Sequence, residues 1–252
     1  MDSRGGAETR IRRSLVLLAW VLGCSAARTE PLPTFERSQI VAHAETLALR
    51  VDGDSLGVMV LQLEVGRDSV RGAITPYYHD SMAQHVLMTF DPRSLRPVRV
   101  RDSSSLEVVD LRYSANRVSG TRIVWNPAGA QDTLNLDVPI DSATLDRRSL
   151  LTVASWLPLA PGRVFGASIF DSWSRRVVPV RIAVGHESRI TVPSGTFRAY
   201  RLDVTTLWAT GPNDFGLFPT VLYVSVDSPR VLLRIERPRQ HAICELISRR
   251  SL

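Results

Sequence analysis

The chain lacks several residue types and patterns, and each absence narrows its chemistry. It contains no lysine: all 31 basic residues are arginine, which is typical of GC-rich bacterial coding sequences and carries no mechanistic weight. It has only two cysteines, at positions 24 and 244. The apolar run that follows Arg13 has about nine residues, whereas a membrane-spanning helix needs roughly twenty. This run is therefore too short to be a transmembrane helix, and the two cysteines allow at most one disulfide bond.

The net charge of +6 is concentrated at the two ends of the chain. Residues 1–23 carry a net charge of +2 and residues 228–252 a net charge of +4, so the segment between them is neutral. A basic patch near the C-terminus can meet anionic lipid head groups or polysaccharide. The alternative is that these arginines are solvated on the outer face of the last strands. Nucleic acid is not an expected partner, because acidic residues are interleaved with the basic ones.

The stretch from Arg175 to Arg237 is a run of alternating segments broken by turn residues. Apolar side chains occupy every second position in residues 178–184, 222–226 and 231–235, and Ile190 and Val192 are expected to continue the same face as the first of these segments. A period of two predicts strands with one dry face and one wet face. A tight turn is expected at Pro193-Ser194-Gly195, because proline presets φ and glycine tolerates a left-handed conformation.

The remainder of the chain is also predicted to be mostly strand, with a loop at Pro76–Gln84. Further strands are expected at residues 46–51, 56–65, 69–74, 98–101, 106–113, 117–125 and 132–136. One helix is expected at about residues 142–157, where apolar side chains at helical spacing follow a capping Asp141 or Ser142 and Pro158 ends the helix. About a dozen short strands and one helix predict an all-β fold. We expect an antiparallel meander that forms a curved half-barrel or closed barrel with one packed helix.

The N-terminus has the features of an export signal over residues 1–23. Arginines at positions 10, 12 and 13 precede a short apolar core that ends in small residues. The sequence Val21-Leu22-Gly23-Cys24 resembles the lipobox of bacterial lipoproteins, and this resemblance implies cleavage before Cys24 and acylation of its sulfur. Ordinary signal cleavage near Ser25-Ala26-Ala27 is the alternative. Residues 24–38 then form a tether, residues 39–252 form a single β-barrel-like domain, and Cys244 is left as a small buried hydrophobe.

Three short motifs carry a family resemblance. They are Phe90-Asp91-Pro92 followed by Leu95 and Pro97, the segment from Leu157 to Gly162, and the segment from Val192 to Phe197. With these motifs the chain resembles exported bacterial proteins of the domain-of-unknown-function 3108 family over roughly residues 45–240. The resemblance implies a β-barrel-like domain in the cell envelope. It implies no established activity, and so it assigns no functional residues.

An enzyme interpretation starts from Gly53-Asp54-Ser55-Leu56, which matches the nucleophile block of GDSL-type serine esterases. Residues 211–214 resemble the second block of that family, so Ser55 would attack an acyl carbonyl and Asn213 would help to hold the oxyanion. Two observations oppose this interpretation. No Asp-x-x-His pair lies near the C-terminus, and residues 56–65 have the pattern of a strand rather than the helix that follows an esterase serine.

A metal site is not expected. His79, Asp80 and His85 lie close together in the sequence, but their spacing matches no standard zinc site, and such side chains in a loop are more often simply solvated. No metal or other cofactor is therefore predicted.

Aromatic residues give the remaining candidate site. An apolar pocket inside the barrel would be lined by Trp125, Trp156, Trp173, Trp208 and Phe197. The alternative is an interior filled solid by side chains, as in small barrels.

We therefore expect a non-catalytic protein of the bacterial envelope, on the periplasmic side and anchored by an acyl chain on Cys24. It would bind a lipid or other amphiphile, or scaffold assembly with another envelope protein. The alternative from the enzyme class is an esterase that uses Ser55.

Overall fold

The computed structural model describes residues 29–79, 81–126, 129–206 and 219–252. The strands of the first part are β1 (Glu30–Pro31), β2 (His43–Val51), β3 (Asp54–Val65), β4 (Val70–Tyr78), β5 (Ser81–Met82), β6 (Gln84–Phe90), β7 (Pro97–Ser104), β8 (Glu107–Tyr113), β9 (Arg117–Trp125), β10 (Gln131–Pro139) and β11 (Thr144–Asp146). Those of the second part are β12 (Val164–Asp171), β13 (Arg176–Val192), β14 (Gly195–Thr206), β15 (Thr220–Ser225), β16 (Leu232–Arg237) and β17 (Ala242–Ser251). The helical elements are η1 (Arg37–Gln39), η2 (Arg147–Ser149), α1 (Leu150–Val153), η3 (Ala154–Trp156) and η4 (Pro238–Gln240).

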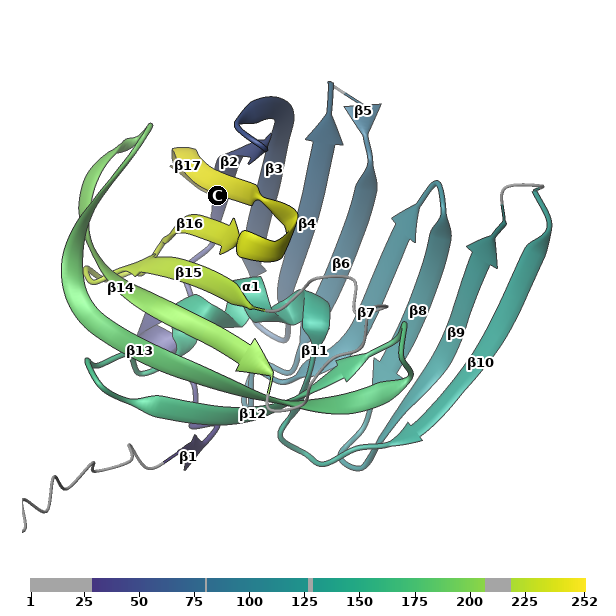
Figure 1. Ribbon diagram of the computed structural model, residues 1–252. Helices are drawn as coiled ribbons and strands as arrows, with labels where there is room; N and C mark the ends of the chain where they lie inside the picture. The colour runs from purple at the N-terminus through teal and green to yellow at the C-terminus, as the bar shows by residue number, and fades with distance from the viewer. Residues whose placement is uncertain (1–28, 80, 127–128, 207–218) are drawn as a thin grey trace, which may run out of the picture.

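These strands form one large, strongly curled sheet. Antiparallel pairs lead from β10 through β9, β8, β7, β6, β4 and β3 to β2. The last strand, β17, pairs with β2, and β16 to β12 continue the sheet on the other side of it. The sheet curls without closing, as Figure 1 shows. The all-β prediction is confirmed, and of its two versions the structure has the half-barrel.

The expected helix is confirmed, but it is shorter than its sequence pattern indicated. Only α1 is α-helical, and the 3₁₀ turns η2 and η3 extend it at either end. Asp141 does not cap a helix; its side chain accepts hydrogen bonds from Ala143 N and Thr144 Oγ1, so the chain leaves this turn extended as β11. The helical cap is Asp146, whose carboxylate accepts from Arg148 N at 2.7 Å.

This helical segment lies inside the curl, against the inward side chains of the sheet (Figure 1). Alternation along each strand supplies those side chains, as with Met59, Leu61 and Leu63 in β3. Gly72 in β4 allows the close approach, because a Cβ there would lie 3.2 Å from Met88 Cε and 3.6 Å from Thr152 Cγ2. The main core is therefore the space between one turn of helix and the concave face of the sheet.

The loop predicted at Pro76–Gln84 is wrong. Strand β4 runs through Pro76 to Tyr78, and β5 and β6 follow almost directly. The irregular sequence hides the strands because proline cannot donate to the ladder. In the structure the Pro76 carbonyl still accepts a hydrogen bond from Ala83 N at 3.0 Å, so the hairpin is maintained around the proline.

The hairpin of β13 and β14 is long enough to reach around to β17. Its turn at residues 193–194 is confirmed, and Ser194 N donates to Leu246 O at 3.1 Å. Ile190 and Val192 were predicted to share a face with Val184, but a bulge between Val184 and Glu187 reverses the alternation. These two residues instead belong to a second, smaller core on the other side of the sheet.

The predicted tether, residues 24–38, is packed on the domain wherever the structure describes it. From Thr29 onward the chain follows the edge of the sheet, and β1 pairs in parallel with β12. Phe35 is 4% exposed, and Glu36 N donates to Trp156 O at 2.7 Å. The apolar side chains of this segment explain its position, since their burial outweighs the freedom of a loose linker. The expected signal, residues 1–23, and Cys24 lie outside the described residues.

Candidate functional site

One end of the concave face holds a cavity of about 200 Å³. Its walls come from β2, β3, β4, β6, β15, β16 and β17 and from the first turn of the helical segment. Half of the lining side chains are aliphatic: Leu49, Met59, Ile74, Pro76, Val86, Leu150 and Leu151. The others are three arginines, Tyr78, Gln84, Thr220 and Cys244. A cavity with such walls in water favours an apolar guest, because the guest removes its own surface and that of the wall from water.

Three arginines also line this cavity: Arg147, Arg148 and Arg237. Arg147 lies 3.2 Å from Asp171 in an ion pair, and burial lowers the pKa of its guanidinium. Arg148 forms ion pairs with the carboxylates of Asp102, Glu107 and Asp146. The side chain of Arg237 makes no hydrogen bond or ion pair with any residue that the structure describes. The cavity therefore combines an aliphatic wall with cations, one of which has no counter-ion among the described residues.

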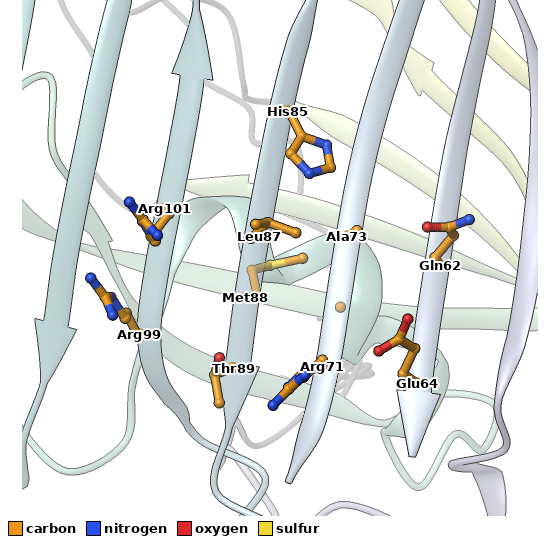
Figure 2. A pocket seen from close by; sticks show the side chains of 11 residues that line it. Gln62, Glu64, Arg71, Ala73, His85, Leu87, Met88, Thr89, Arg99 and Arg101 are labelled. Carbon is orange, nitrogen blue, oxygen red and sulfur yellow. The ribbon is translucent and has the colours of Figure 1, made fainter. Parts of the chain in front are cut away.

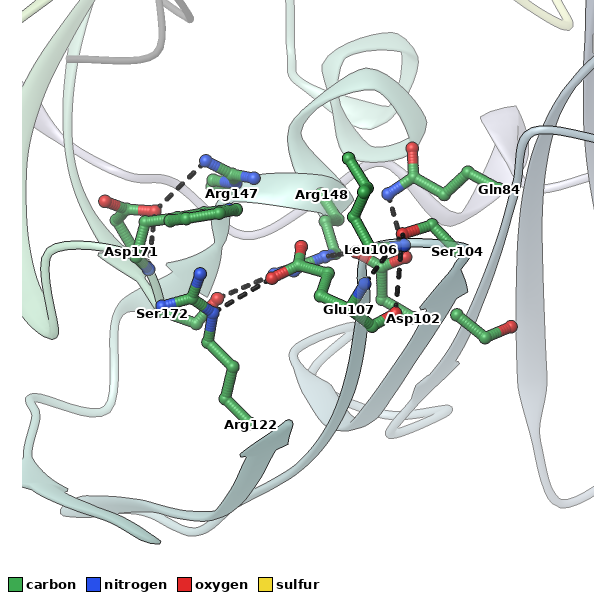
Figure 3. A network of polar contacts seen from close by, with 12 residues as sticks. Gln84, Asp102, Ser104, Leu106, Glu107, Arg122, Arg147, Arg148, Asp171 and Ser172 are labelled. Carbon is green, nitrogen blue, oxygen red and sulfur yellow. Dashed lines mark hydrogen bonds and ion pairs between the residues drawn. The ribbon is translucent and has the colours of Figure 1, made fainter. Parts of the chain in front are cut away.

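Beside the cavity lies a buried cluster of charges, shown in Figure 3. Arg148 Nε contacts Asp102 Oδ2 at 2.5 Å, and its other nitrogens lie 3.5 Å from Glu107 and 3.7 Å from Asp146. Arg122 Nε donates to Glu107 Oε2 at 2.9 Å. All five side chains are at most 6% exposed. Buried charges are tolerated only when they are paired in this way, so the cluster fixes the helical segment on the sheet.

The electrostatics of the cluster follow from its burial. Burial alone lowers the pKa of Arg148, but the nearby carboxylates of Asp146 and Asp102 raise it overall, so this arginine stays charged. Burial, followed by the charge of Asp146, raises the pKa of Tyr113 well above its ordinary value. The Tyr113 hydroxyl donates to Asp146 Oδ2 at 2.5 Å. The tyrosine thus acts as a neutral hydrogen-bond donor that stabilises a buried carboxylate.

The thiol of Cys244 lies on the cavity wall, where it is 8% exposed. Burial raises its pKa to about 11, while the charge of Arg237 acts in the opposite direction. The sulfur is therefore a neutral thiol at physiological pH, as predicted for a small buried hydrophobe.

A second hollow, of about 560 Å³, lies on the outer face of β3, β4, β6 and β7. In Figure 2 the small side chain of Ala73 stands among longer ones, including Arg71, His85 and Arg101. Most of its side chains are exposed or half-buried, and Arg99 is already held by Asp110 through contacts of 3.0 and 2.7 Å. Exposed and paired charges bind a ligand weakly, so this hollow is the weaker candidate.

Of the five aromatic residues predicted to line a pocket, the four that the structure describes are not brought together. Trp156 is fully buried between Phe35 and Phe90, with ring centroids 6.0 and 5.1 Å away. Trp125 is half-buried at the end of β9, and Trp173 stacks under the Arg122 guanidinium at 3.5 Å. Phe197 packs with the second core on the other face, and Trp208 lies outside the described residues. Of the four described residues, Trp156 alone belongs to the main core, and it fills the opposite end of the space that holds the cavity.

The residues of the esterase interpretation are not arranged for catalysis in the described part of the chain. Ser55 is exposed at the start of β3 and has no hydrogen bond to a histidine there. Asn213 lies outside the described residues. The nearby His241 lies 3.5 Å from Asp52, and both side chains are about 70% exposed.

The histidines considered as metal ligands have other roles. His85 shares a hydrogen bond of 2.9 Å with Thr75, and His79 occupies a left-handed turn after β4. Asp80 lies outside the described residues. Among the residues described, no group of three or more His, Cys, Asp or Glu side chains is placed to hold a metal ion. Nor does this part of the chain contain a helix long and apolar enough to cross a membrane.

Sequence reasoning missed the arginines of the cavity and the buried cluster. One signal was available for the cluster: Asp102, Glu107 and Arg122 lie on the inward side of their strands, which they share with the buried residues Val100, Val109 and Val118. A charge on the dry side of a strand requires a buried partner of opposite charge. The partner, Arg148, lies 46 residues beyond Asp102, and the pattern of the strands does not identify it.

Comparison with known proteins places the chain in context. The model of the family described as "Protein of unknown function (DUF3108)" matches residues 55–239. No curated protein matches the chain. Among solved structures, a β-barrel-like protein of domain of unknown function DUF1849 from Brucella abortus aligns with 84% of this chain and 98% of its own, at 12% identity and a TM-score of 0.43. A Bacteroides fragilis protein provisionally described as exported, with a YmcC-like fold, aligns with 87% of this chain and 100% of its own, at 8% identity and a TM-score of 0.33.

Proposed function

Because the chain belongs to the DUF3108 family, for which no activity is described, its role has to be argued from its own geometry, and we propose that it binds a lipid or another amphiphile in the cavity of the concave face. In this proposal the protein does no covalent chemistry. It works in the bacterial envelope, to which the expected export signal and the lipobox-like cysteine at position 24 would direct it.

The observation that carries the proposal is an aliphatic cavity that is open to a guest and lies beside a rigid, charged wall. Side chains from β3, β4 and β6 supply one side, and the buried cluster around Arg148 holds the helical segment that supplies the other. A cavity that stays open needs such support, because a loosely packed core collapses around an unfilled space. The buried cluster therefore supports binding by keeping two walls apart.

The cavity can be tested with N-phenyl-1-naphthylamine, a neutral fluorophore whose emission rises in apolar surroundings. We expect the purified chain to bind it, and Leu151→Trp to reduce the signal at least tenfold, because the indole would fill the cavity that Leu151 lines. Leu87→Trp is the matched control: Leu87 is 43% exposed on the outer face, so its replacement should leave binding unchanged.

Two results would count against the proposal. One is a wild-type chain that does not bind the fluorophore. The other is a Leu151→Trp variant that keeps the thermal unfolding transition of the wild type and still binds as strongly. Native mass spectrometry of the protein purified from its own membranes would also report the mass of any retained amphiphile and of an acyl group on Cys24.

A further inference from the structure

The three arginines of the cavity differ in what they pair with. Arg147 forms an ion pair with Asp171. Arg148 forms ion pairs with Asp102, Asp146 and Glu107. Arg237, the last residue of β16, is half-buried, and its side chain makes no hydrogen bond or ion pair with any described residue. Of the three cavity arginines, Arg237 is thus the one whose guanidinium has no counter-ion among the described residues.

The acidic residues of β16 and β17 are Glu236 and Glu245, and both pair with arginines other than Arg237. Glu236 precedes Arg237 in β16 and lies 3.4 Å from Arg234. Glu245 in β17 lies 2.5 Å from Arg234 and 3.5 Å from Arg50. A partly buried cation without a counter-ion is unfavourable unless an anion joins it. An anionic group of a ligand in the cavity could therefore supply the missing counter-ion of Arg237.

Arg237 also lies close enough to act on another group of the wall. Its charge lowers the pKa of Cys244, although burial of the thiol has the larger effect and raises that pKa overall. Since Cys244 lines the cavity, the positive potential of Arg237 extends over the aliphatic lining as well.

We propose that the ligand is a single-chain amphiphile with an anionic head, and that the Arg237 guanidinium pairs with this head while the chain occupies the aliphatic cavity. This inference rests on the proposed function, because it specifies the class of guest for the same site. A guanidinium presents two parallel N–H donors that match a carboxylate or a phosphate, so either head group has the required chemistry.

The size of the cavity limits the apolar part. At about 200 Å³ it is smaller than the roughly 300–1,000 Å³ of ordinary ligand pockets. One short aliphatic chain fits this space better than a lipid with two long chains. We therefore take ten-carbon compounds as probes.

Competition against N-phenyl-1-naphthylamine separates the head from the chain. Decanoate, decyl phosphate and decanol share the same chain, and only the first two carry a negative charge. We expect the anionic compounds to bind the wild-type chain about 10- to 100-fold more tightly than decanol, the range for charge-assisted hydrogen bonds. The better of the two anions identifies the head group as carboxylate or phosphate.

Two variants assign the preference to a residue. Arg237→Met removes the charge and keeps most of the aliphatic length, so it should abolish the preference for anions and leave decanol binding unchanged. Arg250→Met is the control, because Arg250 is exposed on β17 and has no described partner, and it should retain the full preference.

The outcomes separate a failure of the Arg237 assignment from a failure of the proposed amphiphile pocket. If decanol competes as well as decanoate, or if Arg237→Met keeps the preference for anions, the assignment of Arg237 is wrong and the amphiphile pocket stands. If the fluorophore does not bind and none of the three compounds binds, the pocket itself is refuted and the head-group assignment falls with it.

Discussion

At one end of the concave face Trp156 fills the space between the helical segment and the sheet, whereas at the other end the same strands surround a cavity. The filled end receives Phe35 from the segment before β2 and Phe90 from β6, both in edge contacts with the indole. Gly72 lets the helical segment approach the sheet there. At the hollow end β6 presents Val86 to the interior, and this side chain is shorter than the Phe90 ring at the filled end.

This difference shows how one element can serve both stability and binding. Since α1 and its flanking turns run from Arg147 at the hollow end to Trp156 at the filled end, packing at one end positions the walls at the other. The filled end resembles an ordinary protein interior, where close packing contributes most of the stability. The hollow end gives up part of that packing, and the buried charges beside it hold its shape.

The largest expected effect comes from emptying the filled end. Trp156→Ala should lower the free energy of unfolding by about 3–5 kcal/mol, because it removes a fully buried ring and leaves a cavity. Guanidinium unfolding curves would measure this loss. Trp125→Ala is the control: its half-buried ring at the end of β9 should cost less than half as much. Equal losses for the two variants would mean that Trp156 is not the packing centre.

A slightly smaller effect is expected when the buried charge cluster beside the cavity loses Arg148. Arg148→Met should destabilise the protein by about 3 kcal/mol, because the buried carboxylates of Asp102 and Asp146 would lose their described ion-pair partner. The control is Arg99→Met, which breaks a pair of similar geometry with Asp110 on the exposed outer face and should cost less than about 1 kcal/mol.

The same unfolding curves decide this second comparison. If Arg148→Met were as mild as Arg99→Met, the buried cluster would be screened by water and would not act as a rigid wall. If the cavity binds an amphiphile as proposed, Arg148→Met should also weaken binding of the fluorophore, whereas Arg99→Met should leave that binding unchanged.

The sequence predicted the sheet better than it predicted the site, for a physical reason. Strand β9 was expected at residues 117–125 and has those bounds, because alternation is a local property of neighbouring residues. The surroundings of Trp156 depend on Phe35, which is 121 positions away, and on Phe90, so its burial at one end of the cavity could not be inferred locally. Arg237 was counted with a basic C-terminal segment, and only the curl of the sheet shows that it faces inward.

The smallest stability effect in this series concerns the thiol at the hollow end. Burial raises the pKa of Cys244 from its ordinary value of 9.0 to about 11 in the folded protein. Between these values the unfolded chain has lost the thiol proton while the folded chain keeps it. The unfolded state therefore binds fewer protons, and the free energy of unfolding must fall as pH rises from 9 to 11.

For one group with a shift of this size, the fall amounts to about 2–3 kcal/mol. Cys244→Ala should remove that part of the pH dependence. Tyrosines also titrate in this range, and burial raises the pKa of Tyr113 in both proteins, so the informative quantity is the difference between the two pH profiles. We expect the wild type to lose more stability than the variant over this interval, when unfolding is followed at pH 8, 9, 10 and 11. Parallel profiles would show that the thiol is hydrated in the folded state, and a hydrated thiol would mean that water, rather than an apolar guest, occupies the cavity beside it.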